Sequence, residues 1–211
     1  MISADYCRLL ARYNSWQNTS LVTAADGLTD SERWLDRGAV FKSIAATLNH
    51  LYWADALMLE RIKGNQRPQD KITHALTSPS DWANFKDLRA GRNVEIEEWA
   101  ASIANADLSG VTRWYPPDGS ARIEMPKTVC IVQLFDHQTH HRGQIHAMLT
   151  TAGAKPEPTD IPAMPQASVD PTPHKKSPRQ PPGTSEGKDT DKRCGDLRSP
   201  PNQGGRAPEY F

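Results

Sequence analysis

The strongest constraint on the fold comes from residues 126–152, whose first half is apolar on almost every side of a helix. Such a pattern is typical of a helix at the centre of a bundle. Pro126 suits the first turn of a helix, and Gly153 suits its end. One face of this helix carries Cys130, Leu134, His137, His141, Gln144 and Met148. Because a central helix needs other elements to cover it, further helices are expected in the chain.

Three further stretches have apolar residues at helical spacing, namely residues 1–27, 43–63 and 81–104. Ser43 and Asp81 are suitable N-caps for the second and third of these stretches. Gly27 and Gly64 stand where the first and second should end. With the helix at 126–152, these stretches predict an all-α fold, a four-helix bundle.

The connections between the predicted helices differ in character. Residues 28–40 indicate a polar connection, which we expect Trp34 and Leu35 to pin to the core, and residues 65–80 indicate a loop. Residues 111–125 alternate on both sides of a Pro-Asp-Gly turn, which predicts a small β-hairpin before the last helix. An isolated hairpin is marginally stable, so it should pack against the helices.

The composition changes after residue 165. Residues 156–162 predict an extended strap, but residues 166–211 are rich in Pro, Gly, Ser, Lys, Arg and Asp and hold few large apolar side chains. Such a segment cannot bury enough apolar surface to offset its chain entropy. We therefore predict one helical domain at 1–165 and a disordered low-complexity tail at 166–211.

The bulk composition argues against several classes of function. The chain has 25 Lys and Arg and 25 Asp and Glu, so its zero net charge gives no reason to expect a nucleic-acid partner or an acidic membrane surface. No apolar run is long enough for a membrane span, and the N-terminus lacks a signal-peptide pattern. The cysteines, Cys7, Cys130 and Cys194, are far apart, which favours free thiols in a cytoplasmic protein.

The histidines form the most specific functional pattern. His137 and His141 stand four residues apart, so both lie on the same face of the predicted last helix. Two imidazoles at this spacing suit a divalent metal, but a stable site usually needs another protein ligand. His50, in or beside the apolar face of the 43–63 helix, could supply it inside a bundle. Three imidazoles with an open position are typical of a catalytic metal site.

The histidines and the acidic residues also have simpler interpretations that involve no metal. A lone histidine such as His50 is more often a hydrogen-bonded core residue than a ligand, and histidine pairs also occur by chance. The acidic group Glu95, Glu97 and Glu98 is more typical of a solvated helix face than of a metal site. The chain lacks the H-E-x-x-H motif of zincin proteases and the Glu-x-x-His motif of di-iron bundles.

Three motifs carry a resemblance to a known family: Tyr13-Asn-Ser-Trp-Gln-Asn18, Leu48-Asn-His-Leu51 with Asp55, and His137-Gln-Thr-His-His-Arg-Gly-Gln144. Together they resemble the DinB family of damage-inducible, YfiT-like proteins, over roughly residues 1–164. The resemblance implies a four-helix bundle, often dimeric, that holds one divalent metal through three histidines. By position these are His50, His137 and His141. The metal could be zinc, nickel, iron or manganese.

The resemblance and the residues together imply two alternative functions. In the first, the protein is a metal-dependent S-transferase or hydrolase that activates a small thiol or water for attack on an electrophilic small molecule. In the second, it is a non-catalytic metal-binding bundle acting in stress response. A third reading has the histidines packed without metal. No catalytic nucleophile or base stands out. Gln144 is the best candidate to orient a ligand, whereas Arg142 and Tyr13 could equally be bundle contacts.

Overall fold

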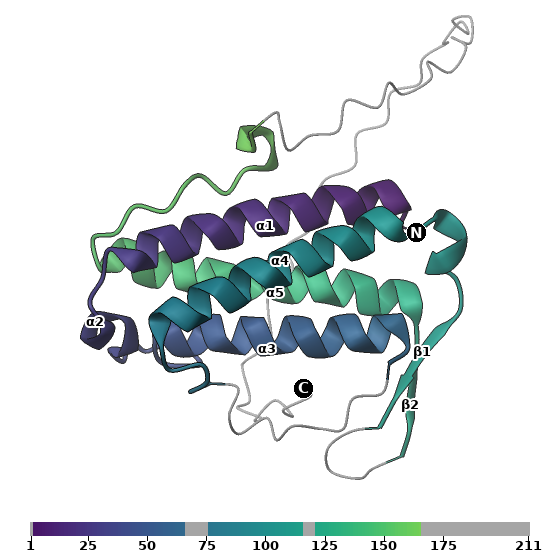
Figure 1. The fold of residues 1–211 in the computed structure, drawn as a ribbon, viewed down its shortest axis with the longest axis horizontal. Coiled ribbons are helices and arrows are strands. Elements are labelled where there is room, and N and C mark those ends of the chain that lie inside the picture. Colours follow the sequence, from purple (N-terminus) through teal and green to yellow (C-terminus); the bar gives the residue numbers. More distant parts are fainter. Residues whose placement is uncertain (1, 66–75, 116–120, 166–211) are drawn as a thin grey trace, which may run out of the picture. The chain divides into compact units, whose positions relative to one another are not determined.

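The computed structural model describes residues 2–65, 76–115 and 121–165 of the chain. Four long helices form a bundle (Figure 1): α1 (Ala4–Asp26), α3 (Ile44–Lys63), α4 (Trp82–Ser102) and α5 (Lys127–Thr151). Helix α1 packs against α4 and α5, and α3 packs against the same two helices. The predicted four-helix bundle is therefore confirmed.

Most ends of the long helices lie at the residues that the sequence predicts, but α1 begins at Ala4, after the N-cap Ser3, and α4 ends at Ser102 and not at residue 104. Ser43 Oγ accepts a hydrogen bond from the backbone N–H of Ala46 at 3.1 Å, and the Asp81 carboxylate accepts from two backbone N–H groups of α4. These side chains satisfy donors that have no partner inside a helix. At the end of α3, Gly64 has a φ of 80°, which glycine adopts without steric cost.

The connection at residues 28–40 differs from the prediction, because it contains a short helix, α2 (Asp30–Trp34). Thr29 and Glu32 form a capping box at its start. The backbone N–H of Thr29 donates to Glu32 Oε2 at 2.7 Å, and the backbone N–H of Glu32 donates to Thr29 Oγ1 at 3.3 Å. The Thr-x-x-Glu signal for this helix was present in the sequence.

The prediction that two apolar side chains hold this connection against the core is also wrong. Trp34 and Leu35 are 37% and 54% exposed, whereas Arg33 is buried. The Arg33 guanidinium donates to the carbonyl oxygen of Ala25 at 2.9 Å and lies 4.5 Å from the centroid of the Trp82 ring. It thereby adds a donor to a carbonyl in the last turn of α1, which also accepts from the backbone N–H of Leu28 at 3.1 Å. A cation, not an apolar side chain, anchors the connection.

The predicted hairpin is present between α4 and α5. Strands β1 (Val111–Trp114) and β2 (Ile123–Pro126) pair antiparallel, with the first residue of β1 opposite the last residue of β2. The guanidinium of Arg61 on α3 lies 4.8 Å from the centroid of the Trp114 ring, an attractive cation–π contact. The hairpin therefore packs against the helices, as expected. Its predicted turn, at residues 116–120, lies outside the described residues.

The strap after α5 runs along α1 without helix or strand up to residue 160, as the sequence predicts, whereas residues 161 and 162 of the predicted strap lie in a 3-10 helix. The Tyr13 hydroxyl donates to the carbonyl oxygen of Thr159 at 2.5 Å, and Gln17 Nε2 donates to that of Pro158 at 2.8 Å. These bonds tie the strap to α1. The described ranges also include two short 3-10 helices, η2 (Asn105–Leu108) and η3 (Ile161–Ala163).

The interior of the bundle contains two apolar clusters separated by polar residues. One cluster includes Ala11, Leu59, Ile96 and Leu134, and the other includes Leu21, Leu48, Phe85 and Ile145. Along α1, α4 and α5, buried polar side chains stand between the residues of the two clusters, and on α3 the buried Asp55 pairs with Arg89 of α4. We call the following set the central polar layer: Asn14, Asn18, Asp55, Arg89, Asn93, Gln138 and Arg142.

Side chains of the central polar layer connect neighbouring helices. Arg89 Nη1 donates to Asp55 Oδ2 at 2.6 Å, and these two side chains are only 2% and 0% exposed. The Arg142 guanidinium donates to Asn14 Oδ1, which joins α5 to α1. Because an unpaired buried polar group is costly, such bonds favour this arrangement of the helices over alternatives that would separate the partners.

Two further predictions concern residues that the structure does not describe. The tail at 166–211, predicted to be disordered, lies outside the described residues, and so does most of the predicted loop at 65–80. The domain boundary at residue 165 therefore stays a prediction. Within the described ranges, none of the helices combines the length and apolar character that a membrane span requires.

Candidate metal centre

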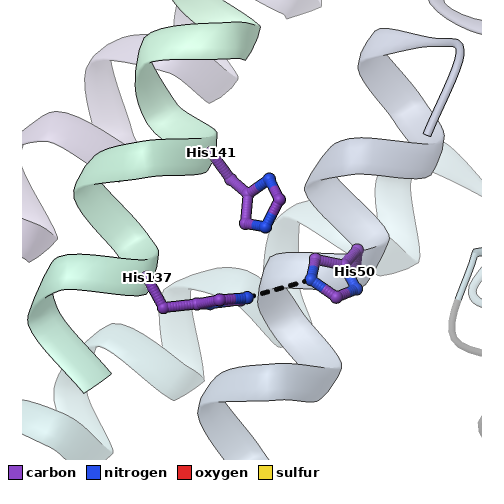
Figure 2. Close-up of side chains that lie close together, drawn as sticks. All are labelled: His50, His137 and His141. Carbon is purple, nitrogen blue, oxygen red and sulfur yellow. Dashed lines mark hydrogen bonds between the residues drawn. The ribbon is translucent and has the colours of Figure 1, made fainter. Parts of the chain in front are cut away.

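Three histidines from two helices meet inside the bundle (Figure 2). We call His50 of α3 with His137 and His141 of α5 the histidine cluster. One ring nitrogen from each lies within 4.8 Å of the others, and His50 Nε2 is 3.1 Å from His137 Nε2. Their exposed fractions are 8%, 4% and 6%, respectively. The structure thus brings together all the residues that the sequence predicts as ligands.

Helix geometry and small neighbouring side chains explain how the three histidine rings come together. His137 and His141 are one turn apart on α5, and their ring centroids are 4.5 Å apart. His50 reaches them from α3, a direct neighbour of α5. One turn to either side of His50 stand Ala46 and Ala54, and small side chains at a helix contact leave space for a ring.

Gln144 fixes the orientation of His141. Its Oε1 lies 2.8 Å from His141 Nδ1, and its Nε2 lies 3.1 Å from His140 Nε2. In the arrangement that satisfies both contacts, His141 Nδ1–H donates to Oε1 and the amide N–H donates to His140. His141 Nε2 is then left with the lone pair that a metal requires. Gln144 thus occupies the supporting position that the sequence predicts.

Burial keeps the imidazoles of the cluster neutral. Burial, together with the smaller effect of the charge of neighbouring histidines, lowers the pKa of His50 to about 4 and that of His137 to about 3. Burial also lowers the pKa of His141, although the hydrogen bond to Gln144 opposes this shift. A neutral imidazole has a free lone pair, so all three side chains are in the protonation state that binds metal at neutral pH.

The spacing of the His50 and His137 nitrogens fits a divalent ion. Zinc binds imidazole nitrogen at about 2.0–2.1 Å, so two such ligands at the tetrahedral angle are about 3.3–3.4 Å apart. The 3.1 Å between His50 Nε2 and His137 Nε2 is close to this separation. Without an ion, one of these nitrogens donates a hydrogen bond to the other. The three histidines could therefore hold a metal ion, and a tetrahedral ion held by three ligands has one coordination position left for an external ligand.

Other residues that the sequence raised as candidates make structural contacts. Arg142 donates to Thr139 Oγ1 at 3.2 Å, and its guanidinium lies 5.2 Å from the centroid of the Tyr13 ring. Of the two alternatives for Arg142 and Tyr13, the structure favours bundle contacts. Glu95, from the acidic group on α4, forms an ion pair with Lys63 at 2.9 Å.

Phe41, between α2 and α3, is a neighbour of the cluster that sequence reasoning missed. Its ring centroid lies 4.0 Å from that of His50 and 5.3 Å from that of His141. No periodicity or motif in the sequence signals this contact, because it depends on the path of the connecting segment.

The sequence model of the DinB family matches residues 1–178, which is most of the 211-residue chain. A DinB-like protein from Bacillus cereus has a similar structure, with a TM-score of 0.51 and 19% identity, covering 68% of this chain and 90% of that one. YfiT from Bacillus subtilis also has a TM-score of 0.51, with 15% identity, covering 74% of this chain and 92% of its own. YfiT is described as a probable metal-dependent hydrolase with an unusual four-helix bundle topology.

No curated protein matches the chain. At the identities given, the two solved structures show a shared fold and nothing more. The family match extends over all four long helices and includes each member of the histidine cluster. This chain therefore belongs to the DinB family.

Proposed function

We propose that this DinB-family protein binds one divalent metal ion through His50, His137 and His141 and uses it to activate a small thiol or water. The observation that carries the proposal is the convergence of three buried imidazoles from two helices. A divalent metal supplies positive charge that lowers the pKa of a thiol or water, which makes a nucleophile at neutral pH.

The surrounding residues suit this role. Helices α3 and α5 hold the imidazoles on a rigid frame, and Gln144 orients His141. Burial excludes bulk water from the cluster, which strengthens electrostatic interactions there. YfiT, which shares the fold, is described as a probable metal-dependent hydrolase, and this supports hydrolysis as one of the reactions to test. The thiol alternative comes from the family resemblance.

The deep burial of the cluster favours a second candidate. Because the histidines are only 4–8% exposed, access for a substrate is limited. A metal held there without catalysis would still stabilise the folded protein by binding only that state. The second proposed function is therefore a non-catalytic metal-binding bundle acting in stress response.

Metal analysis of the purified protein tests both candidates. We expect about one divalent ion per chain after reconstitution, because the cluster supplies a single set of three ligands. The same measurement identifies the metal. Small thiols, and then water alone, would next be offered with a panel of electrophilic small molecules. Activity that rises with metal content supports the enzyme, whereas stoichiometric metal without activity supports the non-catalytic bundle. Metal near zero after reconstitution would contradict both.

A further inference from the structure

Phe41 covers part of the histidine cluster, and its position suggests a role beyond packing. We propose that Phe41 is a positioning residue that holds the His50 ring and restricts the size of the external ligand that can reach a metal bound by the cluster. This inference rests on the proposed metal site. Phe41 would select external ligands by size, although it lies on neither of the two helices that carry the histidines.

The contact between Phe41 and His50 is close. Their ring centroids are 4.0 Å apart, with an angle of 31° between the ring planes. The centroids of the three histidine rings are 4.5–5.0 Å from one another, so His50 lies nearer to Phe41 than to either partner histidine. Phe41 also reaches His141, at 5.3 Å. One aromatic ring thus contacts a candidate ligand from each helix.

The backbone around Phe41 is held in a tight turn. The backbone N–H of Arg37 donates to the carbonyl oxygen of Lys42 at 2.8 Å, and that of Lys42 donates to the carbonyl oxygen of Ala39 at 2.8 Å. Lys42 has a φ of 65°, a conformation that residues other than glycine rarely adopt. Such strained conformations persist only where surrounding contacts hold them, and they concentrate at ligand sites.

The turn sends neighbouring side chains in different directions. Val40 is 72% exposed, whereas Phe41 is half-buried against the histidines. A flat ring at this position excludes bulky groups by steric overlap but leaves space for small ones. Selectivity of this kind comes from a clash with the wrong ligand, not from a new attraction to the right one.

Cobalt-loaded protein offers a test that does not depend on catalysis. The visible spectrum of bound Co²⁺ reports the addition of an external ligand, and azide and imidazole serve as a small and a bulky probe. Phe41→Ala should raise the affinity for imidazole at least about tenfold and that for azide less than about twofold, because only the bulky probe meets the ring. Phe41→Leu should fall between wild type and Phe41→Ala, and Phe41→Trp should weaken imidazole binding.

Val40→Ala is the matched control, because it alters the same turn at an exposed side chain and should leave both affinities unchanged. Circular dichroism and cobalt stoichiometry establish that each variant is folded and loaded. In the metal-free protein, Phe41→Ala should also shift the NMR signals of His50, since the ring current of Phe41 is removed.

Equal changes for azide and imidazole in Phe41→Ala, or the same imidazole affinity across the series, would overturn the inference while leaving the metal site intact. Wild-type protein that takes up no cobalt would overturn the proposed function and this inference together. If Phe41→Ala fails to fold, the imidazole affinities of wild type, Phe41→Leu and Phe41→Trp still test the inference. An affinity that decreases in the order Leu, Phe, Trp at residue 41 supports it, and equal affinities overturn it.

Discussion

The histidine cluster and the central polar layer are both buried, and both draw side chains from α3 and α5. On α5 their members are interleaved: His137 and His141 face α3, whereas Gln138 and Arg142, each one residue further along, contribute to the central polar layer. The spacing within each pair is the same, and both pairs are at most 6% exposed. They differ in the chemistry of the groups that they meet.

In the central polar layer, a donor meets an acceptor, as in the ion pair between Arg89 and Asp55. In the histidine cluster, similar nitrogen atoms face one another, and a proton or a cation is needed between them. The ion pair stabilises the fold by itself, whereas the imidazole nitrogens can either share a hydrogen bond or bind a cation. Burial alone therefore does not distinguish a structural polar group from a binding site.

The largest effect on stability should come from breaking the ion pair of the central polar layer. In Asp55→Ala, the Arg89 cation stays buried without its carboxylate, and the free energy of unfolding should fall by about 3–5 kcal/mol. Urea denaturation measures this change. The double variant Asp55→Leu/Arg89→Leu, which removes both charges, should recover most of the loss. A loss below about 1 kcal/mol in the single variant would mean that the pair does not hold the fold.

Removing a member of the histidine cluster should instead affect metal binding. His137→Ala should lower the affinity for a divalent metal at least about 100-fold, since even a change in a residue that supports a ligand costs about 10- to 100-fold. Its helical content should be unchanged. Competition with a chromophoric chelator measures the affinity, and His146→Ala, on the same helix but outside the cluster, is the control. Equal affinities in the two variants would remove His137 from the site.

The two regions should also respond differently to acid. In metal-free protein, the pKa values of His50 and His137, about 4 and about 3, lie below the value of about 6.5 expected in the unfolded chain. The folded state therefore binds fewer protons, and stability should fall as the pH drops below about 6.5. Between pH 7 and pH 5 we expect a loss of about 1–2 kcal/mol for each of these histidines.

Arg142 stays charged throughout this range, because burial lowers its pKa only to about 10. Arg142 should thus add nothing to the change. Denaturation at the two pH values, in wild type and in His137→Ala, isolates the contribution of one histidine. The same loss in both proteins would show that His137 is not neutralised by burial.

The smallest effect should come from the residue that supports the cluster. Gln144→Ala removes the acceptor for His141 Nδ1 and should weaken metal binding about tenfold. Gln144→Glu should retain or improve binding, since a carboxylate also accepts this hydrogen bond. Stability should hardly change because Gln144 is partly exposed. Isothermal titration with the metal measures the change in affinity. An unchanged affinity in Gln144→Ala would limit the role of Gln144 to the surface of α5.

Much of the fold was predictable because it depends on short-range signals. Ser43 and Asp81 cap helices as expected, and the alternation around Pro-Asp-Gly led to the hairpin. Helix α2 could also have been predicted from the Thr29 and Glu32 capping box. The burial of Arg33 could not, because it depends on carbonyl groups of α1 that only the fold brings within reach.

The sequence by itself determined most ends of the long helices and that His137 and His141 share a face, because both follow from the backbone geometry of residues within a turn of each other. Only the tertiary structure decided that His50 meets this pair and that Phe41 lies against them. Those contacts depend on which helices become neighbours and on the path of the segment between α2 and α3. Packing across the whole bundle, and not any local preference, determines both.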